Sequence, residues 1–490
     1  MADNGDIYIG GDTFSSDMPA FNGPIGGKDA FLARFDAQGN YLGGRYLGGT
    51  EEDRVLFLTL DNSNHLWFTG FTYSTNFPTK NPFQSINPGG ASAYVCKLSP
   101  DLKNIEYATY LGGASEDVAD RMAVDKSGYI YVAGRTGSGD FPLKNAWQNY
   151  YAGGVRDVFL TKFIPDGSQL VFSTLMGGSG DDMPFRLAIG NSGDIYVGGF
   201  TNSTNFPIKN PFQATNHGDF DIFISRFNAN GSELLYSSYL GGSGEDWHGN
   251  FVLDDSGYIY ITGSTYSSDF PIKAALISQY SGGRDGFLSI LTPDGKGLVY
   301  SSYWGGSGWE RCLNIARDSA GNIYLAGETE SYDFPVLNAF QPSFGGIADF
   351  FVSKFSFNFG QKSKIELNLS RMNFMLCIPV LTTKSKYFLI KYTGQYPPDW
   401  DITTNVPWLN CSPIKGTGKA KITVSVNTSG LGPGIYRGTI NVNASNAANS
   451  PQTIAVIMSV HTVGTDVSFL GSQIGSQIDL HECLTSKKIE

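Results

Sequence analysis

Side chains suited to ligand binding stand beside an acidic residue at five recurring points along the 490-residue chain. The set comprises Arg54, Asp120, Arg121, Arg186, Trp247, His248, Asn250, Trp309, Arg311 and Asn314. Tryptophan rings offer stacking faces for sugars, and guanidinium groups bond to hydroxyl and carboxylate oxygens. These residue types therefore predict a glycan-binding site. The alternative reading is packing between repeats and ordinary surface variation.

The acidic residues beside them recur at one register, in runs such as LGGSGED (240–246). They are Glu52, Asp53, Glu116, Asp117, Asp181, Asp182, Glu245, Asp246 and Glu310. An acidic collar would suit a cation or acid/base work on a glycan. An acid needed in every repeat is more simply structural, because it can accept backbone N–H bonds in a Gly-rich turn. We favour the structural interpretation.

Catalytic and metal-binding motifs are absent from the sequence. It contains no HExxH, no P-loop, no EF-hand loop and no GxSxG between a strand and a helix. The five histidines are scattered, and the five cysteines contain no CxxC. We therefore expect no cofactor and no metal, and favour a protein that is not an enzyme. The sequence leaves open whether Cys377 and Cys411 pair.

Composition and charge narrow the fold and the partners. Glycine supplies 61 of 490 residues and aromatic residues 14%, a mixture that favours turns and pleated sheets. The formal charge of −11 leaves no basic stripe for nucleic acid. The longest apolar runs, such as IAVIM (454–458), are too short to span a bilayer. We therefore expect an all-β protein with no nucleic-acid partner and no transmembrane segment.

One segment recurs six times, first as GDIYIGGDT (5–13). Its aromatic residue stands at Tyr8, Trp67, Tyr131, Tyr196, Tyr260 and Tyr324, mostly 64 residues apart. Each period carries four strand-like runs that alternate apolar and polar residues between Gly, Asn and Asp turns. Four short antiparallel strands per repeat predict a β-propeller blade, whose faces must be covered by neighbouring blades.

The repeats predict six blades, of which the first and last are incomplete. The chain begins at the second strand of a blade, and the sixth copy stops after its third strand, DFFVSKFS (349–356). Two alternatives remain open. Either SKIELNLS (363–370) helps to close the ring, or an N-terminal portion of the natural protein is missing from this sequence.

Three motifs recur in fixed order: an IAVD-type run leading into GNIYVAG, the DFPxxNAxQ loop, and YLGGSGxD. On these motifs residues 1–358 resemble the seven-bladed β-propeller repeat (SBBP) family. The resemblance implies a propeller fold and a secreted or surface location in bacteria. It implies no activity.

A second domain follows, because the repeat ends near Lys364. Alternating runs within 416–460 predict an immunoglobulin-like β-sandwich. PWLNCSPIKGTG and VNTSGLGPGIYRGTI resemble the BACON domain, a bacterial module often attached to carbohydrate-active and surface proteins. We predict a propeller over 1–360, a BACON-like sandwich over 364–462 and a polar tail over 463–490. Trp400 and Trp408 would be a sugar platform or, as we favour, core aromatics.

These features predict a non-enzymatic bacterial binding or adhesion protein, secreted or on the cell surface, although no signal peptide is visible. The longest loops leave one face of the propeller, so we expect a glycan to bind there. One alternative is a structural subunit of a surface layer or extracellular assembly, and another is a carbohydrate-active lyase or hydrolase. The expected partners are a polysaccharide or surface glycan, other proteins, or further copies of the chain.

Overall fold

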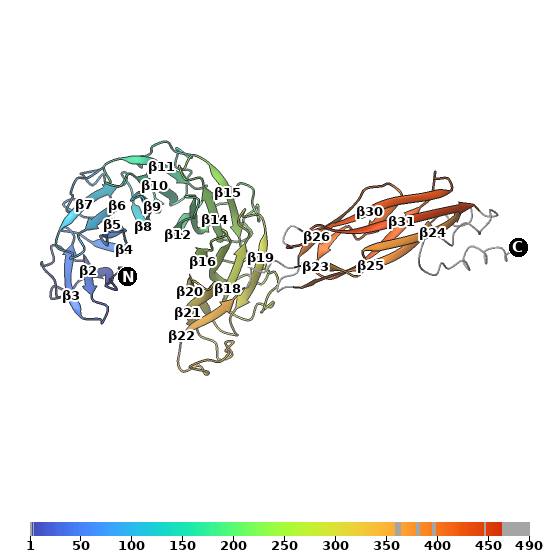
Figure 1. Ribbon diagram of the computed structural model, residues 1–490. Helices are drawn as coiled ribbons and strands as arrows, with labels where there is room; N and C mark the ends of the chain where they lie inside the picture. Colours follow the sequence, from blue (N-terminus) through green and yellow to red (C-terminus); the bar gives the residue numbers. More distant parts are fainter. Residues whose placement is uncertain are drawn as a thin grey trace. The chain divides into compact units, whose positions relative to one another are not determined.

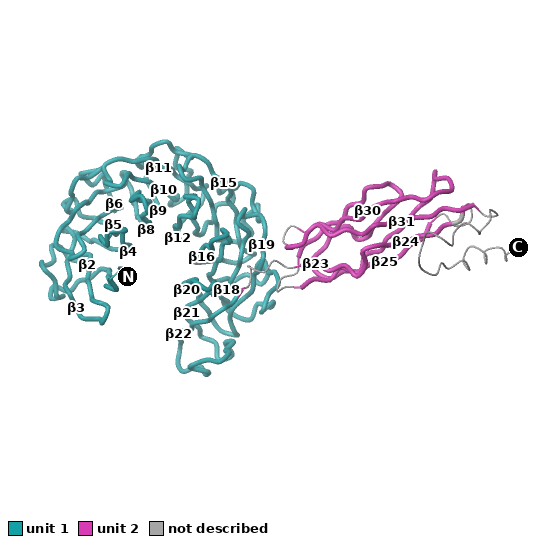
Figure 2. The backbone as a smooth tube through the Cα atoms, in the orientation of Figure 1, with its two compact units in different colours: residues 1–356 teal, residues 357–490 magenta. Residues whose placement is uncertain are grey.

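The computed structural model describes residues 2, 4–357, 364–378, 383–393, 398–444 and 447–462. These residues form β-strands and no helix, which confirms the all-β prediction. The described part of the chain therefore offers no helix that could cross a membrane. The chain divides into two compact units, residues 1–356 and 357–490 (Figure 2).

Unit 1 holds six antiparallel sheets, one for each repeat. The first three comprise β1 (Ile7–Thr13), β2 (Asp29–Phe35) and β3 (Tyr41–Leu47); β4 (Asp53–Leu60), β5 (Leu66–Thr72), β6 (Ser92–Leu98) and β7 (Ile105–Leu111); and β8 (Asp117–Val124), β9 (Ile130–Thr136), β10 (Asp157–Phe163) and β11 (Leu170–Met176). The last three comprise β12 (Asp182–Ile189), β13 (Ile195–Thr201), β14 (Asp221–Phe227) and β15 (Leu234–Leu240); β16 (Asp246–Leu253), β17 (Ile259–Thr265), β18 (Asp285–Leu291) and β19 (Leu298–Trp304); and β20 (Glu310–Arg317), β21 (Asn322–Thr329) and β22 (Asp349–Ser356).

Figure 1 shows these sheets side by side along an open arc, with β1–β3 at one end and β20–β22 at the other. The two end sheets have three strands each and the four interior sheets have four, as in blades of a β-propeller. The first strands of successive repeats, β4, β8, β12, β16 and β20, contact one another along the inner edge. Of the two alternatives for the incomplete ring, closure by 363–370 is contradicted by the pairing of this segment. Its described part, β23 (Lys364–Leu367), pairs with β25 (Thr383–Thr393) of unit 2.

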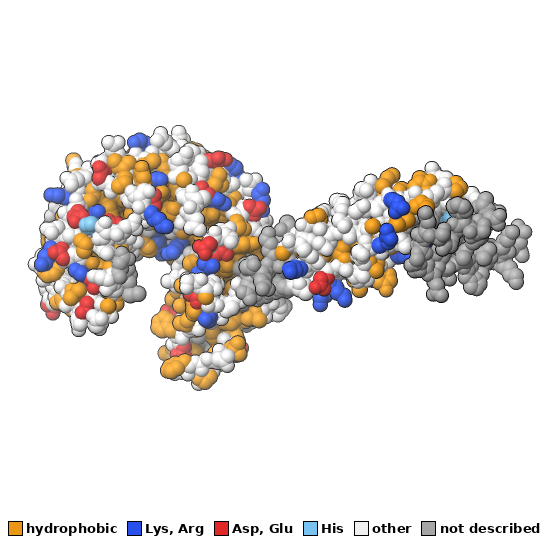
Figure 3. Space-filling model, viewed as in Figure 1, with side chains coloured by type: hydrophobic (Ala, Val, Ile, Leu, Met, Phe, Trp, Pro, Cys, Tyr) orange, Lys and Arg blue, Asp and Glu red, His pale blue; other side chains and the backbone are white. Residues whose placement is uncertain are grey.

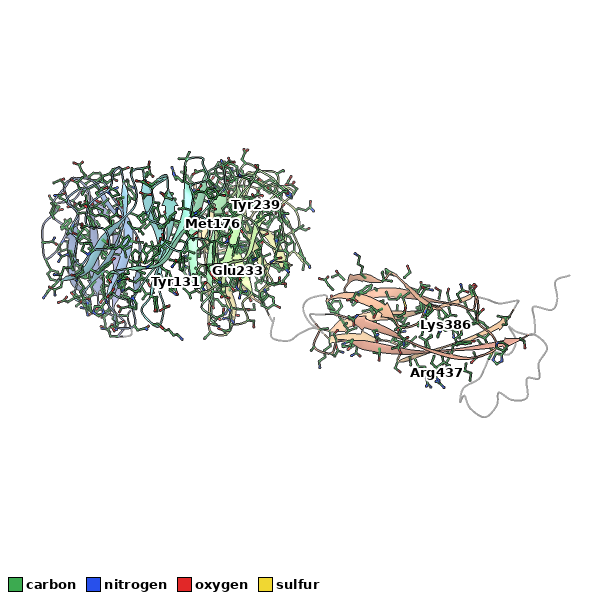
Figure 4. The ribbon with its side chains drawn as sticks, turned by 90° about the horizontal axis from the view of Figure 1, so that it is seen from above. Tyr131, Met176, Glu233, Tyr239, Lys386 and Arg437 are labelled. Carbon is green, nitrogen blue, oxygen red and sulfur yellow. The ribbon has the colours of Figure 1, made fainter. Side chains whose placement is uncertain are left out.

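The alternating strand pattern buries both faces of each interior sheet. On β10, Val158 and Leu160 point to one face and Phe159 to the other, and all three are fully buried. Tyr131, Met176 and Tyr239 belong to one apolar cluster between the third and fourth sheets. Figure 4 views the sheets edge on, with Tyr131 toward one face of the arc and Tyr239 toward the opposite face.

The first strand of each sheet from the second to the sixth opens with a fully buried acid: Asp53, Asp117, Asp182, Asp246 and Glu310. Asp53 accepts hydrogen bonds from the Thr72 hydroxyl, from Ser74 Oγ at 3.0 Å and from the Gly49 backbone N–H at 2.7 Å. Equivalent bonds recur at the other four acids. The acid therefore ties the inner strand to the neighbouring turn, which confirms the structural interpretation for these five acids.

Unit 2 contains two sheets around one apolar core. One has the order β23, β25, β29 (Ala420–Asn427) and β27 (Leu409–Ser412). The other has the order β24 (Arg371–Ile378), β31 (Gln452–Thr462), β30 (Gly434–Asn443), β26 (Asp399–Thr404) and β28 (Lys415–Thr417). The immunoglobulin-like and BACON-like assignments of this unit stay predictions.

Trp400 and Trp408 are 4% and 9% exposed and pack in the core of unit 2, so the sugar-platform reading is wrong for both. The predicted tail, 463–490, lies outside the described residues. So does the side chain of Cys377, and Cys411 is a free cysteine.

Candidate ligand-binding site

A β-bulge interrupts every inner strand at the same register, and it divides the candidate residues into two groups. The breaks fall at Val55/Phe57, Ala119/Arg121, Pro184/Arg186, Trp247/Asn250 and Cys312/Asn314. Before the bulge stand Arg54, Trp247, Trp309 and Arg311, which we call the rim. After it stand Phe57, Arg121, Arg186, Asn250 and Asn314, which we call the post-bulge row. A bulge redirects the side chains that follow it, so the two groups need not share one surface.

Trp309 is the exposed aromatic residue of the rim. It directly precedes β20, and its side chain is 48% exposed. The Arg284 guanidinium lies over its ring, 5.2 Å from the centroid, and the Tyr266 ring meets it edge on at 6.3 Å. Arg284 and Tyr266 therefore fix the position of the indole, while much of its surface stays exposed to solvent.

Trp247 has different surroundings, although its position in the repeat is only two residues away. Its half-buried ring packs against Phe200 at 5.1 Å and Phe220 at 5.0 Å. Its Nε1 donates a hydrogen bond to Glu245 at 2.9 Å. These contacts join β16 to the preceding sheet, so the packing alternative describes Trp247 better than a ligand platform does.

The two rim arginines contact acidic side chains of their own sheets. Arg54 Nε donates to Glu52, and the Arg54 guanidinium stacks on Phe71 with 5.6 Å to the ring centroid. Arg311 Nη1 lies 3.8 Å from Glu328 Oε2, across the pair of strands β20 and β21. Both residues offer polar groups at the rim, and Arg311 shares its sheet with Trp309.

The post-bulge row brings residues about 64 positions apart into contact. Asn250 Nδ2 donates to Asn314 Oδ1 at 2.7 Å. The Arg121 guanidinium lies between the rings of Phe57 and Phe185, 5.7 Å from each centroid. Neighbouring blades therefore meet at this register, which periodicity alone does not reveal.

Asp120 occupies the bulge of β8 and is 7% exposed. Burial raises its pKa to about 6, although the guanidinium groups of Arg135, Arg121 and Arg156 oppose that shift. Its Oδ1 accepts a hydrogen bond from Arg135 Nη1 in an ion pair. Asp120 is thus a structural acid of the third sheet rather than a free ligand.

His248 lies in the bulge of β16, and its side chain is outside the described residues. Among the described residues, no three His, Cys, Asp or Glu side chains gather in a way that could hold a metal ion.

Sequence reasoning missed Tyr266 and Arg284, which support Trp309, and Arg135 and Arg156 beside Asp120. One signal was available for two of these arginines. The position before the third-strand acid reads Lys28, Ala91, Arg156, Phe220, Arg284 and Ala348, so it varies as strongly as the rim does.

Comparison with known proteins supports the repeat. The profile of the β-propeller repeat SBBP matches residues 106–142, 235–271 and 312–335. The regulatory protein FlaEY of Caulobacter vibrioides is 24% identical over 320 residues, which are 62% of this chain and 33% of that protein. The chain thus spans about a third of the length of this relative.

Solved structures resemble the chain only distantly. A polysaccharide lyase of family PL25, an ulvan lyase bound to an oligosaccharide, matches with a TM-score of 0.39 and 10% identity over 94% of this chain and 91% of its own. The extracellular domain of a putative hybrid two component system from B. thetaiotaomicron matches with a TM-score of 0.31 and 10% identity over 92% and 57%. Likenesses at this level transfer no function.

Proposed function

We propose that the chain is a non-enzymatic binding module of a bacterial surface or secreted protein, and that it recognises a glycan through the rim beside Trp309. The observation that carries the proposal is the half-exposed indole supported by Arg284 and Tyr266. A large apolar ring held open to solvent costs hydration free energy, and a sugar face would cover it.

The polar surroundings of Trp309 suit a carbohydrate. The apolar C–H face of a sugar can pack on the indole while its hydroxyl groups bond to neighbouring polar groups. Arg311 and Glu328 supply donors and acceptors on the same sheet, and both side chains remain partly exposed. A single platform with a few polar partners predicts modest affinity and no bond cleavage.

A glycan array followed by isothermal titration calorimetry tests this proposal. Trp309→Ala should weaken binding of the best array ligand at least tenfold, about 1.4 kcal/mol. Tyr150→Ala is the matched control, because Tyr150 is 62% exposed and lies on a long loop of another sheet. Equal affinities of Trp309→Ala and the wild type would reject the site. Release of reducing or unsaturated sugars from polysaccharides would favour the enzymatic alternative.

A structural role in an assembly is the second candidate, and the apolar face of the last sheet favours it. On β22, Phe350 and Val352 are 83% and 75% exposed. Figure 3 shows hydrophobic side chains, in orange, gathered over β22 and the loop before it. Light scattering should then detect oligomers of the wild type that the double variant Phe350→Asp, Val352→Asp does not form. A wild type that stays monomeric at high concentration would count against this candidate.

A further inference from the structure

Two arginines of the post-bulge row, Arg121 and Arg186, stand at equivalent positions of adjacent inner strands, β8 and β12. The row carries Phe57, Asn250 and Asn314 in the neighbouring sheets, so the basic residues occur side by side at this one junction. Figure 3 shows Lys and Arg side chains, in blue, on the inner edge of the arc near β8 and β12. They gather there although the chain carries a formal charge of −11.

Arg121 is fixed in orientation but keeps donors to spare. The rings of Phe57 and Phe185 flank its guanidinium, and Nη1 donates to the Asp120 backbone oxygen at 2.7 Å. The carboxylate of Asp120, which interacts with Arg121, is engaged by Arg135. A guanidinium has five N–H donors in a planar fork, so a stacked Arg121 can still present an edge to a ligand.

The side chain of Arg186 has no hydrogen bond and no ion pair within the described residues, and its Nε is buried without a partner. Burial lowers the pKa of Arg186, and the positive charge of Arg121 lowers it further. Two guanidinium groups that repel each other in a half-buried place are stabilised by an anion between or beside them.

Six other arginines of unit 1 are paired with or lie near carboxylates, whereas Arg45, Arg156 and Arg284 donate to other groups. Arg34 bonds to Asp6, Arg54 to Glu52, Arg135 to Asp120 and Arg226 to Asp194, and Arg311 and Arg317 lie near Glu328 and Asp255. The acids around Arg121 and Arg186 do not neutralise both guanidinium charges. Asp120 interacts with Arg121, Arg135 and Arg156, and Asp181 interacts with Arg135 and Arg156, so in the part of the chain that the structure describes Arg186 has the charge of Arg121 beside it and no acid.

We propose that Arg121 and Arg186 form a binding site for an oxyanion, a sulfate or carboxylate group, at the junction of the third and fourth sheets. Planar guanidinium forks match the oxygens of such groups and bind them with charge-assisted hydrogen bonds. This site lies on β8 and β12, whereas Trp309 precedes β20, so it stands independently of the glycan proposal. The source is either a free inorganic anion or an anionic group of a larger ligand.

The test is calorimetry of the full chain with sodium sulfate and with dextran sulfate, using neutral dextran as the blank. Arg186→Gln should weaken binding of either anion at least tenfold, about 1.4 kcal/mol. Arg45→Gln is the matched control, because Arg45 is also half-buried with an unpartnered Nε but donates to the Lys103 backbone oxygen. Loss of both anions in Arg186→Gln supports the site, and loss of dextran sulfate alone supports it with a polymeric source.

Melting temperature supplies a second readout that separates binding from structure. Without added anion, Arg186→Gln should melt at or above the wild-type temperature, because an uncompensated charge is removed. Sulfate should raise the melting temperature of the wild type and of Arg45→Gln, and not that of Arg186→Gln. Binding of neither anion by the wild type, or equal binding by Arg186→Gln and the wild type, would overturn the proposal.

Discussion

The fifth and sixth sheets of unit 1 come from the same repeat, yet their equivalent side chains have opposite surroundings. Leu288 is the third residue after the acid that opens β18, and it is 1% exposed. Val352 is its equivalent on β22 and is 75% exposed. The loop aromatic of the third sheet shows a similar contrast with that of the sixth, since half-buried Trp147 packs on Phe227 of the fourth sheet while Phe340 is fully exposed. A repeat thus encodes an apolar face, and only the next sheet buries it.

The largest effect should come from truncating the equivalent pair Leu288 and Val352. Leu288→Ala removes methyl groups from a packed core and should cost about 2–5 kcal/mol of unfolding free energy. Val352→Ala should change it by less than about 0.5 kcal/mol, because the side chain already faces water. Urea unfolding followed by circular dichroism measures both. A comparable loss in both variants would mean that β22 is covered in solution.

The two tryptophans extend the comparison to the rim. Trp247→Ala leaves a cavity beside Phe200 and Phe220 and should lower the free energy of unfolding by about 2 kcal/mol. Trp309→Ala should cost less than about 1 kcal/mol, because nearly half of its surface is exposed. Thermal unfolding checks the order. A larger loss for Trp309 would make it a packing residue and would remove the basis of the glycan proposal.

A smaller effect concerns how the free energy of unfolding depends on pH through buried acids between neighbouring sheets. Burial, with a contribution from Asp182, raises the pKa of Asp157 to about 7, well above the ~3.9 of an unfolded chain. Between those pH values the native state holds a proton that the unfolded state has released, so the free energy of unfolding falls as pH rises. Asp157→Asn should reduce this fall by on the order of 1–2 kcal/mol between pH 4 and pH 8.

The second repeat supplies the converse variant for that experiment. Ser92 stands where Asp157 stands in the third repeat, next to the buried acid Asp117. Ser92→Asp should therefore add a loss of stability at high pH, because it places a second carboxyl beside Asp117. Urea titrations at several pH values would compare the slopes. Identical slopes for Asp157→Asn and the wild type would show that Asp157 does not control the pH dependence.

Much of unit 1 could be predicted from the sequence, because its signals are local. The period near 64 residues, the alternation within each strand and the buried acids lie within one repeat. The limits of β22 agree with the predicted run 349–356. The sheet to which 363–370 belongs was harder to predict, because a strand-like pattern does not indicate the pairing partner. In the structure β23 pairs with a strand of unit 2.

The candidate site was predictable in residue type and not in arrangement. Departures from the repeat marked Trp247 and Trp309 equally. Phe200 and Phe220 pack against the first, whereas Arg284 and Tyr266 contact the second and leave it 48% exposed. The post-bulge row depends on a break in strand pairing that leaves the residue count of the repeat unchanged. Pattern alone therefore did not separate Arg121 and Arg186 from the rim.

The sequence by itself determined the strands, the sheets and the buried acids of unit 1, because each depends on residues within one repeat. The tertiary structure decided which equivalent side chains are open to solvent and which arginines lack a carboxylate. Those properties belong to contacts between residues about 64 positions apart, such as Arg121 with Phe57 and Phe185. Burial and charge pairing arise at such contacts, and no single repeat contains both sides of one.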